Sequence, residues 1–208
     1  LRCHPALVLA RTPFPMPILT RPVELRCNHL TNPLGQHDTT PTLSGRLHAG
    51  DLRGALQTAY RLSVSTSRNG SADLWDSGWV KSDATSGIAY AGKALASRQR
   101  AWWRVEVRDE TGRVSASAPA FWEMGLLKPS DWTAAWIGAE LTGGPESSVP
   151  SPYLRTIFNA GAAIASARLF VTALGLYEFQ INGQRVGTDE FAPGWTDYAK
   201  SGKYQAHD

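Results

Sequence analysis

Apolar and polar residues alternate repeatedly through the first 125 residues of the chain. Val23, Leu25 and Cys27 alternate with polar neighbours, and the same period of two returns at residues 60–64 and 103–107. Because successive side chains of a strand point to opposite faces, each of these runs predicts a half-buried β-strand.

Shorter runs between these segments add further strands. Residues 42–47, 74–80, 88–90 and 120–124 are rich in β-forming residues, and turn formers such as Asn69-Gly70 separate the runs. Seven short strands without a helical pattern are typical of a fibronectin-III or immunoglobulin-like β-sandwich. We place this all-β module at residues 23–125.

The segments on either side of this module have a different character. Residues 1–22 contain four prolines between Pro13 and Pro22, which disfavour both helix and sheet, so we predict a poorly ordered arm. Residues 126–152 carry tryptophans followed by a stretch rich in Gly, Pro and Ser, and are expected to form a connector and loop.

A second β-rich module is predicted over residues 153–208. Strands are expected at 153–158 and 165–174, followed by a hairpin over 177–187 whose tight turn is Asn182-Gly183. About four strands fit here, fewer than a sandwich or jelly roll needs, so we expect an incomplete jelly-roll-like domain.

Composition excludes several classes of function. There are 21 basic and 18 acidic residues, and the densest basic stretch, Arg98 to Arg108, is interrupted by Glu106. We interpret it as a solvated strand face, so we expect no nucleic-acid partner. The apolar run at residues 6–10 is too short to span a membrane and weak as a signal sequence, and the compartment stays undetermined.

No metal or cofactor motif stands out. The five histidines are dispersed, and Cys3 and Cys27 are too few for a disulfide framework, although one bridge between them is possible. Gly143-Gly144 lacks the strand-to-helix context of a phosphate-binding loop, and no nucleophile elbow is present. We therefore expect no cofactor.

Two sets of motifs resemble one family of enzymes. Residues 166–187 (SARLFVTALGLYEFQINGQRVG) and 191–198 (FAPGWTDY) are similar to the N-terminal β-domain of bacterial α-L-rhamnosidases. Residues 25–35, 57–65, 74–78 and 103–109 resemble the fibronectin-III-like module that precedes that domain.

The chain departs from the family pattern at two places. Gly45 replaces a usual Trp, leaving a gap that a neighbour such as Trp79 could fill, and residues 201–203 are less β-prone, which weakens the expectation of a last strand.

The resemblance implies that the chemistry lies elsewhere. In this inverting family a downstream (α/α) barrel cleaves terminal α-L-rhamnose with a carboxylic acid and a carboxylate. The long amphipathic helices of such a barrel have no counterpart here, so we expect an N-terminal, non-catalytic fragment that is inactive alone and has no catalytic residue. Its partners would be the missing barrel and, through the parent enzyme, rhamnose-containing carbohydrate. A rhamnose-binding module and a cell-surface adhesion array are the alternatives.

The resemblance also points to candidate sugar contacts, because some members hold rhamnose on such domains, sometimes with calcium. Trp195 and Tyr198 could stack on a sugar ring while Asp197 accepts its hydroxyl groups. The competing interpretation, which we favour, is that both rings are packing residues. Asp189, Glu190 and Asp197 could act in catalysis or bind calcium, but a turn with a solvated edge explains them better.

Overall fold

The computed structural model describes residues 20–50, 53–140, 147, 149–161 and 163–208. The chain divides into two compact units. The first contains the described residues up to Thr31 together with Thr40–Lys93 and Ala101–Phe121; the second contains Asn32–Thr39, Ala94–Arg100 and Trp122–Asp208. The module boundaries expected from the sequence stay predictions. Cys3, Gly143-Gly144 and most of the Pro-rich arm lie outside the described residues.

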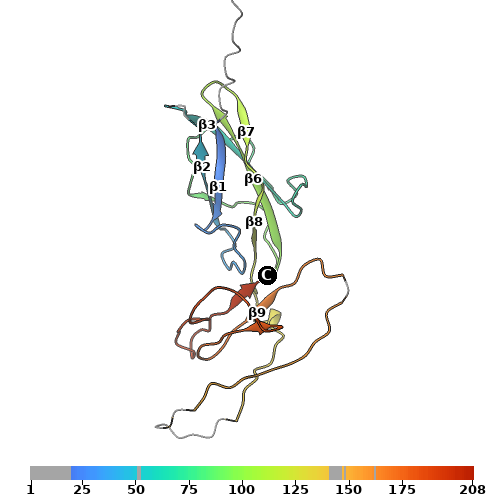
Figure 1. Ribbon diagram of the computed structural model, residues 1–208. Helices are drawn as coiled ribbons and strands as arrows, with labels where there is room; N and C mark the ends of the chain where they lie inside the picture. The colour runs from blue at the N-terminus through green and yellow to red at the C-terminus, as the bar shows by residue number, and fades with distance from the viewer. Residues whose placement is uncertain (1–19, 51–52, 141–146, 148, 162) are drawn as a thin grey trace, which may run out of the picture. The chain divides into compact units, whose positions relative to one another are not determined.

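Two antiparallel sheets form the first unit (Figure 1). One has the order β1-β2-β5, built from β1 (Arg21–Cys27), β2 (Thr42–His48) and β5 (Ile88–Ala89). The other has the order β4-β3-β6-β7, from β4 (Trp75–Asp76), β3 (Gln57–Ser65), β6 (Arg100–Asp109) and β7 (Val114–Ala116), and β8 (Ala120–Glu123) also pairs with β6. The first residue of β6, Arg100, and the last two of β8, Trp122 and Glu123, belong to the second unit. The prediction of an all-β fold is confirmed.

The two sheets share one hydrophobic core. Leu43 of β2, Leu62 of β3 and Trp103 of β6 are each at most 2% exposed, and all three line a cavity of about 20 Å³. Along β6 the buried residues alternate strictly with half-buried ones, as the period of two predicts. Burial of these side chains, at about 25 cal/mol per Å² of apolar surface, stabilises the unit.

Some strands differ from the prediction. β1 begins at Arg21, inside the expected arm, because Pro22 lies on an edge strand, where a missing backbone donor is tolerated. The expected strand at 74–80 shortens to β4, and Val80 makes only an isolated bridge with Tyr60. β7 was not predicted, since its three residues are too few to show a period.

The sequence predicts a gap at Gly45, where a tryptophan is replaced, and Trp79 was the candidate to fill it. Gly45 lines the cavity of about 20 Å³, so the gap beside it is small. A Cβ atom at Gly45 would lie 3.0 Å from Leu25 Cδ2, which shows how closely the neighbouring strand approaches. Trp79 does not fill the gap. It is 38% exposed and lies against the guanidinium of Arg108, 4.3 Å from the ring centroid.

The second unit has short elements: the 3-10 helix η1 (Pro129–Asp131) and the strands β9 (Leu169–Val171), β10 (Gln180–Ile181), β11 (Gln184–Arg185) and β12 (Gln205–His207). β10 and β11 form the predicted hairpin. Asn182 and Gly183 have φ values of 51° and 79°, and these left-handed conformations are those that a primed turn requires.

The strand prediction was less successful elsewhere in this unit. Residues 153–158 form no strand, and the strand expected at 165–174 shortens to β9. A strand needs a hydrogen-bonding partner, and no described segment pairs with residues 153–158. Conversely, a last strand does form, because β12 pairs with β9 in antiparallel register.

Tyr204 connects several segments of the second unit. Its hydroxyl group accepts a hydrogen bond from the backbone N–H of Leu126 at 2.7 Å and lies 2.7 Å from His37 Nε2. Its ring contacts those of Trp132 and Phe170. Burial raises the pKa of this phenol. Segments far apart in the sequence are thus joined by one side chain.

Candidate functional site

Trp195 and Tyr198 lie together on the second unit, as the candidate sugar site requires. Their ring centroids are 5.7 Å apart with an interplanar angle of 51°, and the Tyr198 hydroxyl accepts a hydrogen bond from Gly175 N at 2.9 Å. A turn closed by the hydrogen bond from Gly194 N to Phe191 O precedes Trp195. Trp195 is 81% exposed, so it is not a core residue of the described chain.

The carboxylate of Asp197 stabilises a local turn. Its Oδ1 accepts a hydrogen bond from Ala199 N at 3.1 Å, and its Oδ2 forms an ion pair with Lys200 Nζ at 3.2 Å. An aspartate that accepts from the backbone two residues further on is a common turn former. The carboxylate therefore has a structural explanation, and a sugar hydroxyl would have to share it with Lys200.

Asp189 and Glu190 are held by the hairpin that precedes them. Arg185 pairs with the Glu190 carboxylate at 2.8 Å and donates to the backbone oxygen of Asp189 at 2.7 Å. The hydrogen bond from Arg185 lowers the pKa of Glu190. An exposed carboxylate with a lowered pKa cannot deliver a proton at neutral pH, which disfavours a role for Glu190 as a general acid.

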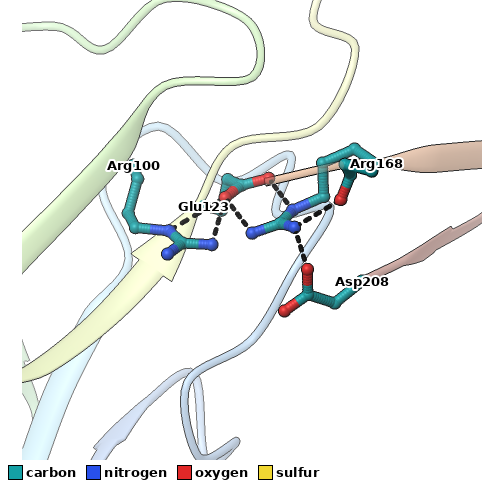
Figure 2. Close-up of polar contacts among 5 residues, drawn as sticks. Arg100, Glu123, Arg168 and Asp208 are labelled. Atoms are coloured by element: carbon teal, nitrogen blue, oxygen red, sulfur yellow. Dashed lines mark hydrogen bonds and ion pairs between the residues drawn. The ribbon is translucent and has the colours of Figure 1, made fainter. Parts of the chain in front are cut away.

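The most elaborate polar cluster of the second unit surrounds Glu123, at the end of β8 (Figure 2). Arg100 Nη2 lies 2.8 Å from Glu123 Oε2, and Arg168 Nε lies 2.7 Å from Oε1. Arg168 also pairs with Asp208 and donates to the backbone oxygen of Ala167. We call these four side chains, Arg100, Glu123, Arg168 and Asp208, the Glu123 cluster.

Burial sets the electrostatics of this cluster. Glu123 is 5% exposed, and burial raises the pKa of its carboxyl group, although Arg100 favours the charged form. Both carboxylate oxygens are occupied by guanidinium groups, so no face of Glu123 is open to a substrate. The arrangement is that of a structural ion network.

Sequence reasoning missed this cluster. The available signal was an acidic residue in the otherwise apolar run 120–124, since a buried carboxylate needs a cationic partner. No sequence pattern indicates which arginine supplies this partner, because Arg168 lies 45 residues away.

Neither a metal site nor a membrane-spanning helix is found in the described parts of the chain. Within those ranges no group of three or more His, Cys, Asp or Glu side chains is arranged to hold a metal ion. A calcium ion bound near Asp197 stays a prediction. The same residues include no helix with the length and apolar character that crossing a bilayer requires.

Comparison with family models identifies two segments. Residues 22–128 match the model described as "Rha78A-like, N-terminal immunoglobulin domain", in agreement with the sandwich of the first unit. Residues 162–208 match the "Alpha-L-rhamnosidase N-terminal domain". The two matches follow one another in the order expected from the motifs.

Curated relatives give the same assignment. α-L-Rhamnosidases from Alteromonas sp. (strain LOR) and Streptomyces avermitilis are 37% and 34% identical to this chain, over 86% and 76% of its length. The matches cover 21% and 17% of those proteins. The chain thus spans about a fifth of the length of the curated relatives it matches.

Solved structures agree with the sequence relatives. The α-L-rhamnosidase from Dictyoglumus thermophilum superposes with a TM-score of 0.75 at 30% identity, over 90% of this chain and 23% of that one. The Streptomyces avermitilis enzyme complexed with L-rhamnose gives 0.55 at 32% identity, over 84% and 19%. By both domain models, by its relatives and by its fold, the chain belongs to the α-L-rhamnosidase family and carries sequence of the family's N-terminal domains.

Proposed function

We propose that this chain is the N-terminal, non-catalytic part of an α-L-rhamnosidase, whose other domains hydrolyse terminal, non-reducing α-L-rhamnose. The observation that carries the proposal is the ordered pair of N-terminal domain matches in a chain that spans about a fifth of its relatives. The β-units described here would support or flank the catalytic part.

The carboxylates of the described residues support the non-catalytic assignment. Glycoside hydrolysis by inversion needs an acid and a base that face each other across a space large enough for the sugar and a water molecule. Glu123 is enclosed by two guanidinium groups, and Asp76 accepts two hydrogen bonds from Arg61 and a third from Gly78 N. Glu190 is exposed and paired with Arg185.

The parent activity can be tested on the natural gene product that carries this chain. Purified protein should release the aryl group from an aryl α-L-rhamnoside and leave aryl β-D-glucoside and aryl α-L-arabinoside intact. A well-folded gene product that does not cleave the rhamnoside would contradict the proposal.

We also propose that Trp195, supported by Tyr198, contacts saccharide. The 81% exposure of an indole ring that lies against a second aromatic ring supports this, because sugars stack on the faces of aromatic rings. The ring of an exposed tryptophan is accessible to a ligand, whereas the ring of a core tryptophan is covered by other residues of its own domain.

Calorimetric titration tests the saccharide contact. The chain is titrated with L-rhamnose in the presence of calcium and in the presence of a chelator, and Trp195→Ala should abolish the binding heat. Trp136→Ala is the matched control, since Trp136 is also exposed, at 66%, in the same unit. Absence of heat from the unmodified chain would disprove this contact.

A further inference from the structure

The solvent-facing side of the larger sheet in the first unit is rich in arginine. On β6, Trp102, Arg104, Glu106 and Arg108 alternate with the buried residues and so share the outer face. Arg61 of β3 lies on the same face, directly opposite Glu106 in the register. The outer face of two central strands therefore presents charged and aromatic side chains together.

Arginine and aromatic side chains are stacked near both ends of this face. The guanidinium of Arg68 lies 5.6 Å from the Trp102 ring centroid, and that of Arg108 lies 4.3 Å from the Trp79 centroid. Trp102 also contacts Phe121, with ring centroids 5.0 Å apart. At ~3.3 Å per residue, the six steps from position 102 to 108 span about 20 Å.

Charge on this face is unevenly compensated. Arg61 forms ion pairs with both nearby carboxylates, with Asp76 at 2.6 Å and with Glu106 at 3.7 Å. Arg104 donates instead to neutral oxygens, the Arg68 backbone at 3.2 Å and the Asn69 side chain at 2.9 Å. Among the described residues, Arg68, Arg104 and Arg108 form no ion pair. The face has a positive excess.

We propose that Trp79, Trp102, Arg68, Arg104 and Arg108, the arginine–aromatic face, bind an acidic oligosaccharide. Guanidinium groups bind carboxylate and sulfate oxygens in bidentate geometry, and tryptophan rings stack on the apolar faces of sugars. Charge complementarity selects an anionic ligand, and a row about 20 Å long accommodates several sugar rings.

An open sheet face suits a sugar chain better than it suits a peptide. Peptides are usually held at a sheet edge or in a groove, where their backbone or an apolar helix face is covered. Three residues of the arginine–aromatic face, Trp102, Arg104 and Arg108, lie instead on β6, a central strand of its sheet. The choice of a saccharide over other polyanions rests on the proposed function of the parent protein, while the face shares no residue with the Trp195 site.

Binding is measured on the full 208-residue chain by calorimetry at low salt. The probes are an oligogalacturonate for carboxylate-bearing sugars and a sulfated dextran oligomer for sulfated ones. Maltoheptaose is the neutral saccharide control, and polyglutamate is the acidic peptide control. We expect saturable binding of at least one acidic saccharide, weakened by added salt, with no comparable binding of either control.

Matched charge variants locate the site. Arg104→Gln with Arg108→Gln should weaken binding at least tenfold, because each lost charge-assisted contact costs about a tenfold factor. Arg21→Gln with Arg26→Gln removes the same charge from exposed positions of β1, in the other sheet, and should change affinity by less than about twofold. Circular dichroism verifies that both variants are folded.

Three results would overturn this inference: no binding of either acidic saccharide, equal binding of polyglutamate, or equal losses in the two double variants. None of these measurements depends on hydrolysis. A gene product without rhamnosidase activity would therefore refute the proposed function and leave the arginine–aromatic face to be decided by binding alone.

Discussion

Arg168 donates from Nε to Oε1 of Glu123 at 2.7 Å, although 45 residues separate the two in the chain. Arg100 occupies the other carboxylate oxygen at 2.8 Å, so a single buried acid joins the end of β8 to the start of the segment that contains β9 (Figure 2). Packing of the second unit therefore depends on a polar contact as well as on its hydrophobic residues.

Removal of this acid should destabilise the second unit strongly. Glu123→Ala leaves the largely buried guanidinium of Arg168, whose side chain is 13% exposed, without its main partner. Loss of one member of a buried pair costs about 3 kcal/mol or more, which urea denaturation would detect as a lower free energy of unfolding.

The matched control for this change is Glu24→Ala. Glu24 pairs with Arg46, but both side chains are more than half exposed, so the loss of this pair should be much smaller. Equal losses of stability in the two variants would show that burial does not determine the importance of the Glu123 cluster.

Tyr204→Phe isolates the contribution of one hydroxyl group. The variant keeps the ring contacts but leaves Leu126 N, a backbone donor, without its partner at 2.7 Å, and also loses the contact with His37. We expect a loss of about 1–2 kcal/mol in the free energy of unfolding. Tyr153→Phe is the control, because Tyr153 is fully exposed, and a comparable loss there would contradict the assignment.

Asp76 should contribute to acid sensitivity of the first unit. Hydrogen bonds from Arg61 and from Gly78 N lower the pKa of its carboxyl group to about 2. Between about pH 4 and pH 2 the unfolded chain binds more protons at this position than the folded chain, so its contribution is complete above pH 4 and is lost as pH falls through 2.

Because both partners are more than a third exposed, this contribution should be about 1 kcal/mol or less. Asp76→Asn should flatten the dependence of stability on pH in that range, measured by urea denaturation at several pH values. Asp83→Asn, at another exposed position of the same unit, should leave the profile unchanged. An unaltered profile in Asp76→Asn would be evidence against the assignment.

Exposed apolar side chains of the second unit should make the chain self-associate. Tyr153, Ile157 and Phe191 are between 76% and 100% exposed, and residues 153–158 have no paired strand. Apolar surface and unpaired backbone favour association, so sedimentation velocity should show a mass that rises with concentration. Ile157→Lys should reduce that rise more than Leu30→Lys, which alters an exposed leucine of the first unit.

The first unit was largely predictable because its strands are long enough to show a period. In β6 each buried residue is followed by a half-buried one, and the corresponding sequence alternation was evident. The Asn182-Gly183 turn was equally predictable, since few residue pairs adopt two successive left-handed conformations. β7 was missed because three residues carry no period.

The second unit was harder to predict because its contacts are non-local. The pairing of β9 with β12, the hydroxyl contacts of Tyr204 and the Glu123–Arg168 ion pair all join residues distant in the chain. Periodicity describes a single segment and contains no information about its partner. The prediction of a strand at 153–158 failed for the same reason, because a β-prone run without a partner forms no ladder.

Whether these residues support a rhamnosidase without performing its chemistry is decided by an assay of the purified 208-residue chain on an aryl α-L-rhamnoside. We expect release of the aryl group at the rate of the buffer control, with a known α-L-rhamnosidase as positive control. Turnover that exceeds the buffer rate, scales with chain concentration and persists after repurification would contradict it.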